Sequence, residues 1–115
     1  MDLDSKTEKK IQDLQAIEQN LQAFLSQKQS FQIELNEVNN ALAELKKSGD
    51  EVYKILSNIM VKSNKKDLDI ELNEKKKILD LRINSIEKQE KLIEESALKL
   101  RNEINEAISK GNVKE

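Results

Sequence analysis

The middle of the chain contains the stretch that decides the fold, Val52-Tyr53-Lys54-Ile55-Leu56-Ser57-Asn58-Ile59-Met60-Val61-Lys62. Two runs rich in β-branched and aromatic residues, each too short for a stable helix, flank the turn-forming residues Ser57 and Asn58. This pattern predicts a tight β-hairpin. We expect Asn58 to be the turn residue with a positive φ, because asparagine tolerates that conformation better than most residues.

The expected hairpin is apolar on both faces, with Tyr53 and Ile55 on one side and Val52 and Leu56 on the other. An isolated two-stranded hairpin is marginal in water, and its two open edges can pair with another chain. The alternative, an ordinary small core, is disfavoured because so short a chain has little else with which to cover these residues. We therefore predict an oligomerisation module made of Val52, Tyr53, Ile55, Leu56, Ile59, Met60 and Val61.

The N-terminal arm, residues 5–48, is expected to be one long helix. Ser5 with Glu8 three residues later predicts a capping box at its start, and Lys47 followed by Gly49 suits its end. A coiled-coil seam is indicated by residues in alternating steps of three and four, interrupted only by a lysine: Leu14, Ile17, Leu21, Phe24, Lys28, Phe31, Leu35, Val38, Leu42 and Leu45.

The C-terminal arm, residues 66–110, is predicted to be a second helix of similar length, with Asn64 as its cap and Asp67 in its first turn. A chain that folds back at the hairpin lays arm on arm as an antiparallel coiled coil. Ile11 then lies near Ile104. One seam position is aliphatic throughout (Leu72, Leu79, Ile86, Ile93, Leu100, Ala107), and its companion is mixed (Lys76, Ile83, Glu90, Ala97, Ile104). Lys28 and Glu90 are expected to sit near each other across the pair.

The composition fits this reading, with 37% charged and 3% aromatic residues and no proline in 115 residues. We expect a mostly α protein with a small β element, forming a single domain over residues 1–115 with the hairpin at 51–63. The absence of cysteine and histidine, and of any phosphate-binding loop, predicts no enzyme activity and no cofactor.

The charges are finely mixed, with a net charge of −2, so no basic stripe for nucleic acid is visible. A nucleic-acid binder is therefore the least favoured class. The polar N-terminus does not resemble a secretory signal, and no apolar run approaches the roughly 20 residues that span a bilayer. We expect a cytoplasmic protein without a membrane partner.

The hairpin and its flanks resemble those of the prefoldin family, in particular its archaeal beta-type subunits. The resemblance rests on Glu51-Val52-Tyr53-Lys54, Asn58-Ile59-Met60-Val61, Asp67-Leu68, Leu79-Asp80-Leu81-Arg82 and Ile86-Glu87-Lys88-Gln89-Glu90. It extends over residues 11–108, and the single hairpin is similar to the beta type rather than the two-hairpin alpha type. Family members commonly carry glycine at the position of Ser57, so this turn departs from the family pattern.

The resemblance implies a hexamer of two alpha-type and four beta-type subunits. In that assembly the hairpins join into intersubunit β-barrels, and the coiled coils project from them. It further implies an ATP-independent molecular chaperone that prevents aggregation and delivers unfolded client proteins to a group II chaperonin.

The ends of the arms are the expected site for unfolded proteins, because aliphatic groups on fraying helix ends can hold apolar client segments. Several weak sites acting together would bind strongly. A plain coiled-coil seam is the more favoured reading for Leu14, Ile17 and Leu100. A structural spacer or adaptor without client binding remains the alternative function. The candidate residues are Ile11, Leu14, Ile17, Leu100, Ile104 and Ile108.

Overall fold

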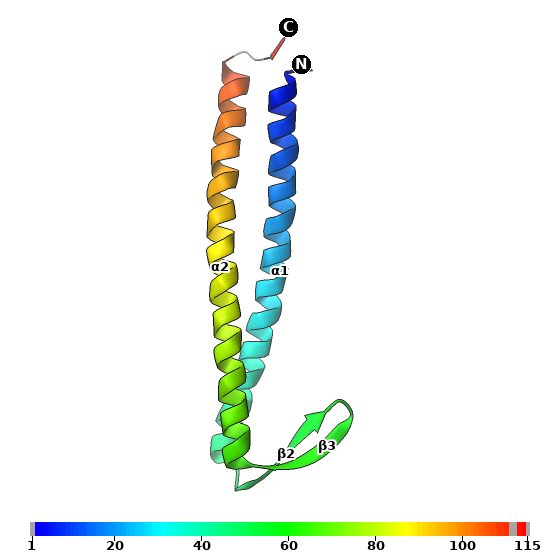
Figure 1. The fold of residues 1–115 in the computed structure, drawn as a ribbon, viewed down its shortest axis with the longest axis vertical. Coiled ribbons are helices and arrows are strands. Elements are labelled where there is room, and N and C mark those ends of the chain that lie inside the picture. Colours follow the sequence, from blue (N-terminus) through cyan, green and yellow to red (C-terminus); the bar gives the residue numbers. More distant parts are fainter. Residues whose placement is uncertain (1, 111–112, 115) are drawn as a thin grey trace. The chain divides into compact units, whose positions relative to one another are not determined.

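A computed structural model describes residues 2–110 and 113–114. The elements are β1 (Asp2–Leu3), α1 (Ser5–Lys47), β2 (Glu51–Leu56), β3 (Ile59–Asn64), α2 (Lys65–Ser109) and β4 (Val113–Lys114) (Figure 1). The contacts divide the chain into two units: a hairpin unit, residues 29–84, and a terminal unit, which holds the residues up to 28 and from 85 onward. The expected fold class, two long helices joined by one β-hairpin, is confirmed.

In the hairpin unit, β2 and β3 pair in antiparallel fashion from Glu51 opposite Asn64 to Leu56 opposite Ile59. The hairpin runs directly into the second helix, because Asn64 ends β3 and Lys65 begins α2. Figure 1 shows β2 and β3 at the junction between the end of α1 and the start of α2. The hairpin is therefore anchored at its base by both helices.

The buried side chains of both helices follow the predicted heptads. In the hairpin unit these are Val38 and Leu45 of α1 with Leu79 and Ile83 of α2. The remaining predicted seam positions are half-buried. Since an α-helix has 3.6 residues per turn, steps of three and four keep one apolar stripe against the partner helix. In the terminal unit the corresponding buried residues are Ile86, Ala97 and Ile104.

Ion pairs fix the antiparallel pairing within the terminal unit. Lys28 Nζ donates a hydrogen bond of 2.8 Å to Glu90 Oε1, which confirms the expected pairing of these two seam residues. This hydrogen bond raises the pKa of Lys28, so the lysine stays charged within the seam. Near the termini, Lys10 and Glu103 approach to 3.6 Å, which brings together the turns that carry Ile11 and Ile104.

The start of α1 differs from the expected capping box. The Thr7 backbone N–H donates to Asp4 Oδ1 at 2.7 Å, so Asp4, and not Ser5, is the cap. The prediction was one residue late because either side chain can accept this hydrogen bond, and only the backbone decides where the helix begins. The hydrogen bonds with Thr7 also lower the pKa of Asp4. The short pairing of β1 with β4 in the terminal unit was not predicted either.

The burial of the seam leads to a prediction about stability, and an exposed leucine on the same helix provides the control variant. Leu79 is 1% exposed, whereas Leu81 on the same helix is 64% exposed. Leu79→Ala should lower the free energy of unfolding by about 2–5 kcal/mol, because it leaves a cavity in the seam. Leu81→Ala should change it by no more than roughly 0.5 kcal/mol. Urea unfolding followed by circular dichroism compares the two, and equal losses would contradict the seam assignment.

Candidate functional site

The hairpin has two chemically different faces, because side chains alternate along each strand. Lys54 reaches Glu71 of α2, so the face that carries Lys54 is the helix-side face. The half-buried Val52 and Val61 share it, as do the exposed Leu56 and Ile59 nearer the turn. The opposite, outer face carries Tyr53, Ile55, Met60 and Lys62.

The outer face presents apolar side chains to solvent. Tyr53, Ile55 and Met60 are all more than half exposed. The Lys62–Glu51 ion pair of 2.7 Å lies beside them, nearer the base of the hairpin. Of the seven residues predicted for oligomerisation, five are exposed, and Val52 and Val61 are half-buried. A contiguous exposed apolar surface of this kind is typical of an interaction site.

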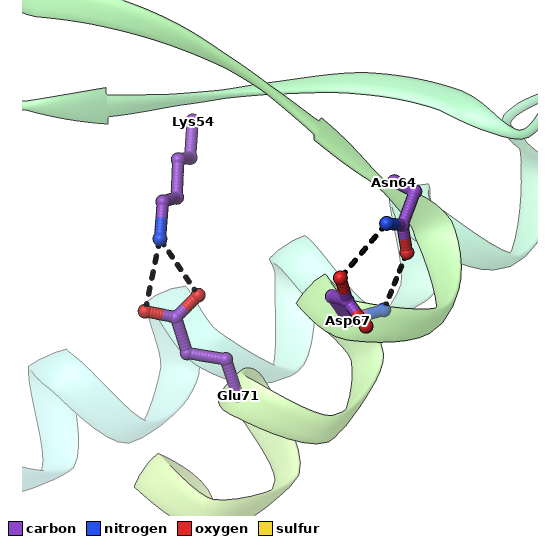
Figure 2. Close-up of polar contacts among 4 residues, drawn as sticks. All are labelled: Lys54, Asn64, Asp67 and Glu71. Atoms are coloured by element: carbon purple, nitrogen blue, oxygen red, sulfur yellow. Dashed lines mark hydrogen bonds and ion pairs between the residues drawn. The ribbon is translucent and has the colours of Figure 1, made fainter.

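Polar contacts hold the base of the hairpin on α2 (Figure 2). The ammonium group of Lys54 lies 3.3 and 3.5 Å from the two carboxylate oxygens of Glu71. Asn64 Oδ1 accepts a 2.8 Å hydrogen bond from the backbone N–H of Asp67, and Asn64 Nδ2 donates at 2.8 Å to Asp67 Oδ2. The predicted Asn64 cap is confirmed. The hairpin therefore leaves the helix in a defined direction.

Lys65 adds a connection that the sequence did not suggest. Its ammonium group donates to the carbonyl oxygens of Lys46 at 3.3 Å and Ser48 at 3.1 Å, at the end of α1. These carbonyls have no partner within the helix, so a cation there satisfies them and suits the helix dipole. One side chain of α2 thus ties down the end of α1.

An apolar pocket of about 400 Å³ lies at the base of the hairpin, within the hairpin unit. Glu44 and Ser48 are among the residues that line it. We call it the root pocket. Its apolar lining comes from both helices and from β2, namely Ala41, Leu45, Val52, Tyr53, Leu68 and Leu72.

The turn corrects one expectation. Ser57 has a φ of 54°, and Asn58 does not adopt a positive φ. A two-residue hairpin loop with a positive φ only at its first position has the φ pattern of a type II′ turn, in which glycine is favoured at that position. The expectation failed because this turn type requires a positive φ at its first loop position, which Ser57 occupies, and the preference of asparagine for a positive φ is too weak to change the turn type. The same geometry explains why glycine suits the position of Ser57 in the resembling family.

Ser57→Gly should therefore stabilise the hairpin. It removes a strain of roughly 1 kcal/mol at the positive φ, partly offset by the greater flexibility of glycine in the unfolded chain. Asn58→Gly is the matched control and should destabilise, because it adds that flexibility without relieving strain. Amide hydrogen exchange of β2 and β3 measures both. Slower exchange in the Asn58 variant than in the Ser57 variant would contradict the turn assignment.

The candidate residues at the helix ends differ in exposure. Ile11, Leu14, Ile17 and Leu100 are half-buried. Ile104 is 7% exposed and Ile108 is 37% exposed. Of the six, Ile108 is the most exposed and offers a partly free side chain while the helices stay paired.

Sequence reasoning missed three exposed aliphatic residues of the terminal unit. Leu25 on α1 is 39% exposed, and Leu92 and Leu98 on α2 are 64% and 57% exposed. All three lie between the heptad positions, and that off-seam position is the sequence signal that could have identified them as exposed.

Two long helices that pack in antiparallel fashion within each unit, bridged by an apolar hairpin, define a class of helical-hairpin proteins. The family model described as prefoldin subunit matches residues 8–111 of the chain. The chain belongs to the prefoldin family. It is therefore a chaperone-type subunit of the kind that acts in hetero-oligomeric prefoldin complexes.

Curated relatives and a solved structure agree with this family. The chain is 37% identical to prefoldin subunit beta of Sulfurisphaera tokodaii over 84% of its own length and 79% of the relative. It is likewise 37% identical to prefoldin subunit beta of Thermococcus onnurineus, over 83% of the chain and 84% of that relative. The crystal structure of the prefoldin beta subunit from Thermococcus strain KS-1 matches with a TM-score of 0.85 and 33% identity, covering 92% of this chain and 95% of that one.

Among the residues that the structure describes, neither helix contains an apolar stretch long enough to cross a membrane.

Proposed function

We propose that the chain is a beta-type subunit of an ATP-independent chaperone hexamer with two alpha-type and four beta-type subunits. It binds non-native polypeptides at the helix ends, prevents their aggregation and passes them to a group II chaperonin in the cytoplasm. The observation that carries the proposal is the likeness to prefoldin beta subunits over more than four-fifths of the chain.

The hairpin supports the assembly part of the proposal. Its outer face leaves Tyr53, Ile55 and Met60 in water, at a free-energy cost of about 25 cal/mol per Å² of apolar surface. Joining hairpins edge to edge into a barrel would cover these side chains and would also pair the open strand edges. Assembly through the hairpin therefore removes two unfavourable features together.

The helix ends support the client-binding part. Ile108 is partly free, and Ile11 and Leu14 are half-covered by the partner helix. Separation of the terminal turns would expose Ile104 as well, and helix ends fray more readily than helix centres. A single end would hold a client weakly, because it offers only a few aliphatic groups. Several ends in one complex raise the effective concentration and multiply the affinity.

The experiment measures light scattering while an unfolded client is diluted into buffer without ATP. The chain is first assembled with an alpha-type subunit. The double variant Ile11→Ser/Ile108→Ser should raise the amount of complex needed for half-suppression by roughly tenfold, because lost contacts worth about 1.4 kcal/mol change an affinity tenfold. Leu81→Ser is the matched control, since it removes an exposed aliphatic side chain of α2 away from the helix ends.

Full suppression by the double variant, in a complex of normal size, would remove the helix ends as the client site. No suppression by the correctly assembled unmodified complex would overturn the chaperone function. The structural spacer or adaptor would then be the better account. Transfer to a chaperonin is tested separately, by release of a labelled client from the complex when the chaperonin is added.

A further inference from the structure

The backbone of β2 has a free edge whose pairing groups can be identified. A two-residue loop makes the flanking residues Leu56 and Ile59 a hydrogen-bonded pair, and the pairing alternates from there. The backbone N–H and C=O groups of Tyr53 and Ile55 therefore point away from β3. Within the described part of the chain, β2 pairs only with β3. Tyr53 and Ile55 are thus the residues with which an added strand would form hydrogen bonds.

The hairpin contributes Val52 and Tyr53 of β2 to the lining of the root pocket and no residue of β3, so the pocket lies beside β2 rather than beside β3. Leu45, Leu68 and Leu72 of the two helices line it too. A strand added to the edge of β2 would carry its helix-side residues over the pocket. The occupant should therefore be an aliphatic side chain on an extended segment.

The hairpin itself supplies such a side chain. Leu56 belongs to the helix-side face, but it is 52% exposed because it lies beyond the cover of the helices. The apolar side chain of Leu56 thus matches the aliphatic residues that line the pocket.

The register follows from matching side chains. An antiparallel second β2 with its Ile55 opposite Tyr53 places apolar residues opposite each other on both faces, and it places Leu56 of the second copy beside Val52. A shift that sets Tyr53 opposite itself would instead place Lys54 of the second copy beside Val52. The favoured register brings the two Lys54 residues together, and each is neutralised by its own Glu71, 3.3 Å away.

We propose that two copies of this chain pair through their β2 edges about a two-fold axis at Lys54, with Leu56 of each copy filling the root pocket of the other. The contact is reciprocal, so one interface fills both pockets and closes on itself. It goes beyond the proposed function by naming the edge, the register and the occupant. It rests on that function only in assuming that the hairpins assemble.

Cysteine cross-linking tests the register, because the chain contains no cysteine. Size-tagged copies carrying Val52→Cys and Leu56→Cys are mixed, assembled with an alpha-type subunit and oxidised. We expect a disulfide between the two variants and several-fold less cross-linking with either variant alone. The reason is that Val52 lies opposite Leu56 of the second copy, but far from Val52 of that copy, and a disulfide needs Cα atoms within about 7 Å.

Two proline variants test the edge. Ile55 and Met60 are directly opposite each other and form no hydrogen bonds between their backbones, so proline at either removes the same small contribution to the hairpin. Introduced into the cysteine-bearing copies, Ile55→Pro should abolish the cross-link between them, because it blocks the β2 edge. Met60→Pro lies on the β3 edge and should preserve the cross-link.

If one cysteine variant alone cross-links as efficiently as the mixture of the two variants, the register is overturned. If the mixed Val52→Cys and Leu56→Cys copies form no disulfide, although their complex assembles and suppresses aggregation, the pairing is overturned and the proposed function stands. Loss of the cross-link with Met60→Pro but not with Ile55→Pro would assign the contact to the other edge. In that case the root pocket would not be the site that Leu56 fills.

Discussion

The burial of aliphatic side chains along the heptad seam is the interaction on which the other features depend. Leu79 is almost wholly enclosed, and Val38, Ile83 and Ala97 are buried at the same repeating positions. Neither long helix would be stable alone with this many charged residues, since most helical stability in proteins comes from packing one apolar face. The polar pair Lys28–Glu90 sits within the seam, where a matched pair favours one register over its neighbours.

The hairpin depends on that pairing, because it stands on the two helix ends. Lys65 ties the end of α1 to the start of α2, and Lys54 with Glu71 fixes the direction of the strands. The apolar outer face is therefore held in one orientation without being covered. A surface that is rigid but uncovered loses little conformational entropy when it binds, which favours assembly.

The two candidate sites use opposite physical principles. The hairpin gains from rigidity, because a strand edge pairs only with a partner in the right register. The helix ends gain from looseness, because Ile104 is buried until the terminal turns separate. The hairpin and the helix ends are far apart along the chain, so the hairpin can be rigid while the helix ends are loose. Fraying at the termini need not disturb the strands. A division of this kind suits the proposed function, in which assembly through the hairpin is firm and each helix end binds a client weakly.

The sequence by itself determined the periodic features, the heptad positions and the two strands, because they follow from repeats of hydrophobicity that no distant contact alters. It placed Lys28 near Glu90 for the same reason. Only the tertiary structure decided the features that depend on local backbone angles or on exposure. Asp4 caps α1 in place of the predicted Ser5, and Ser57 has the positive φ in place of the predicted Asn58. The sequence could not separate these neighbours, because their propensities for capping a helix or for occupying a turn are similar. The root pocket and the free side chain of Leu56 required three-dimensional packing, since residues distant in the chain form the pocket.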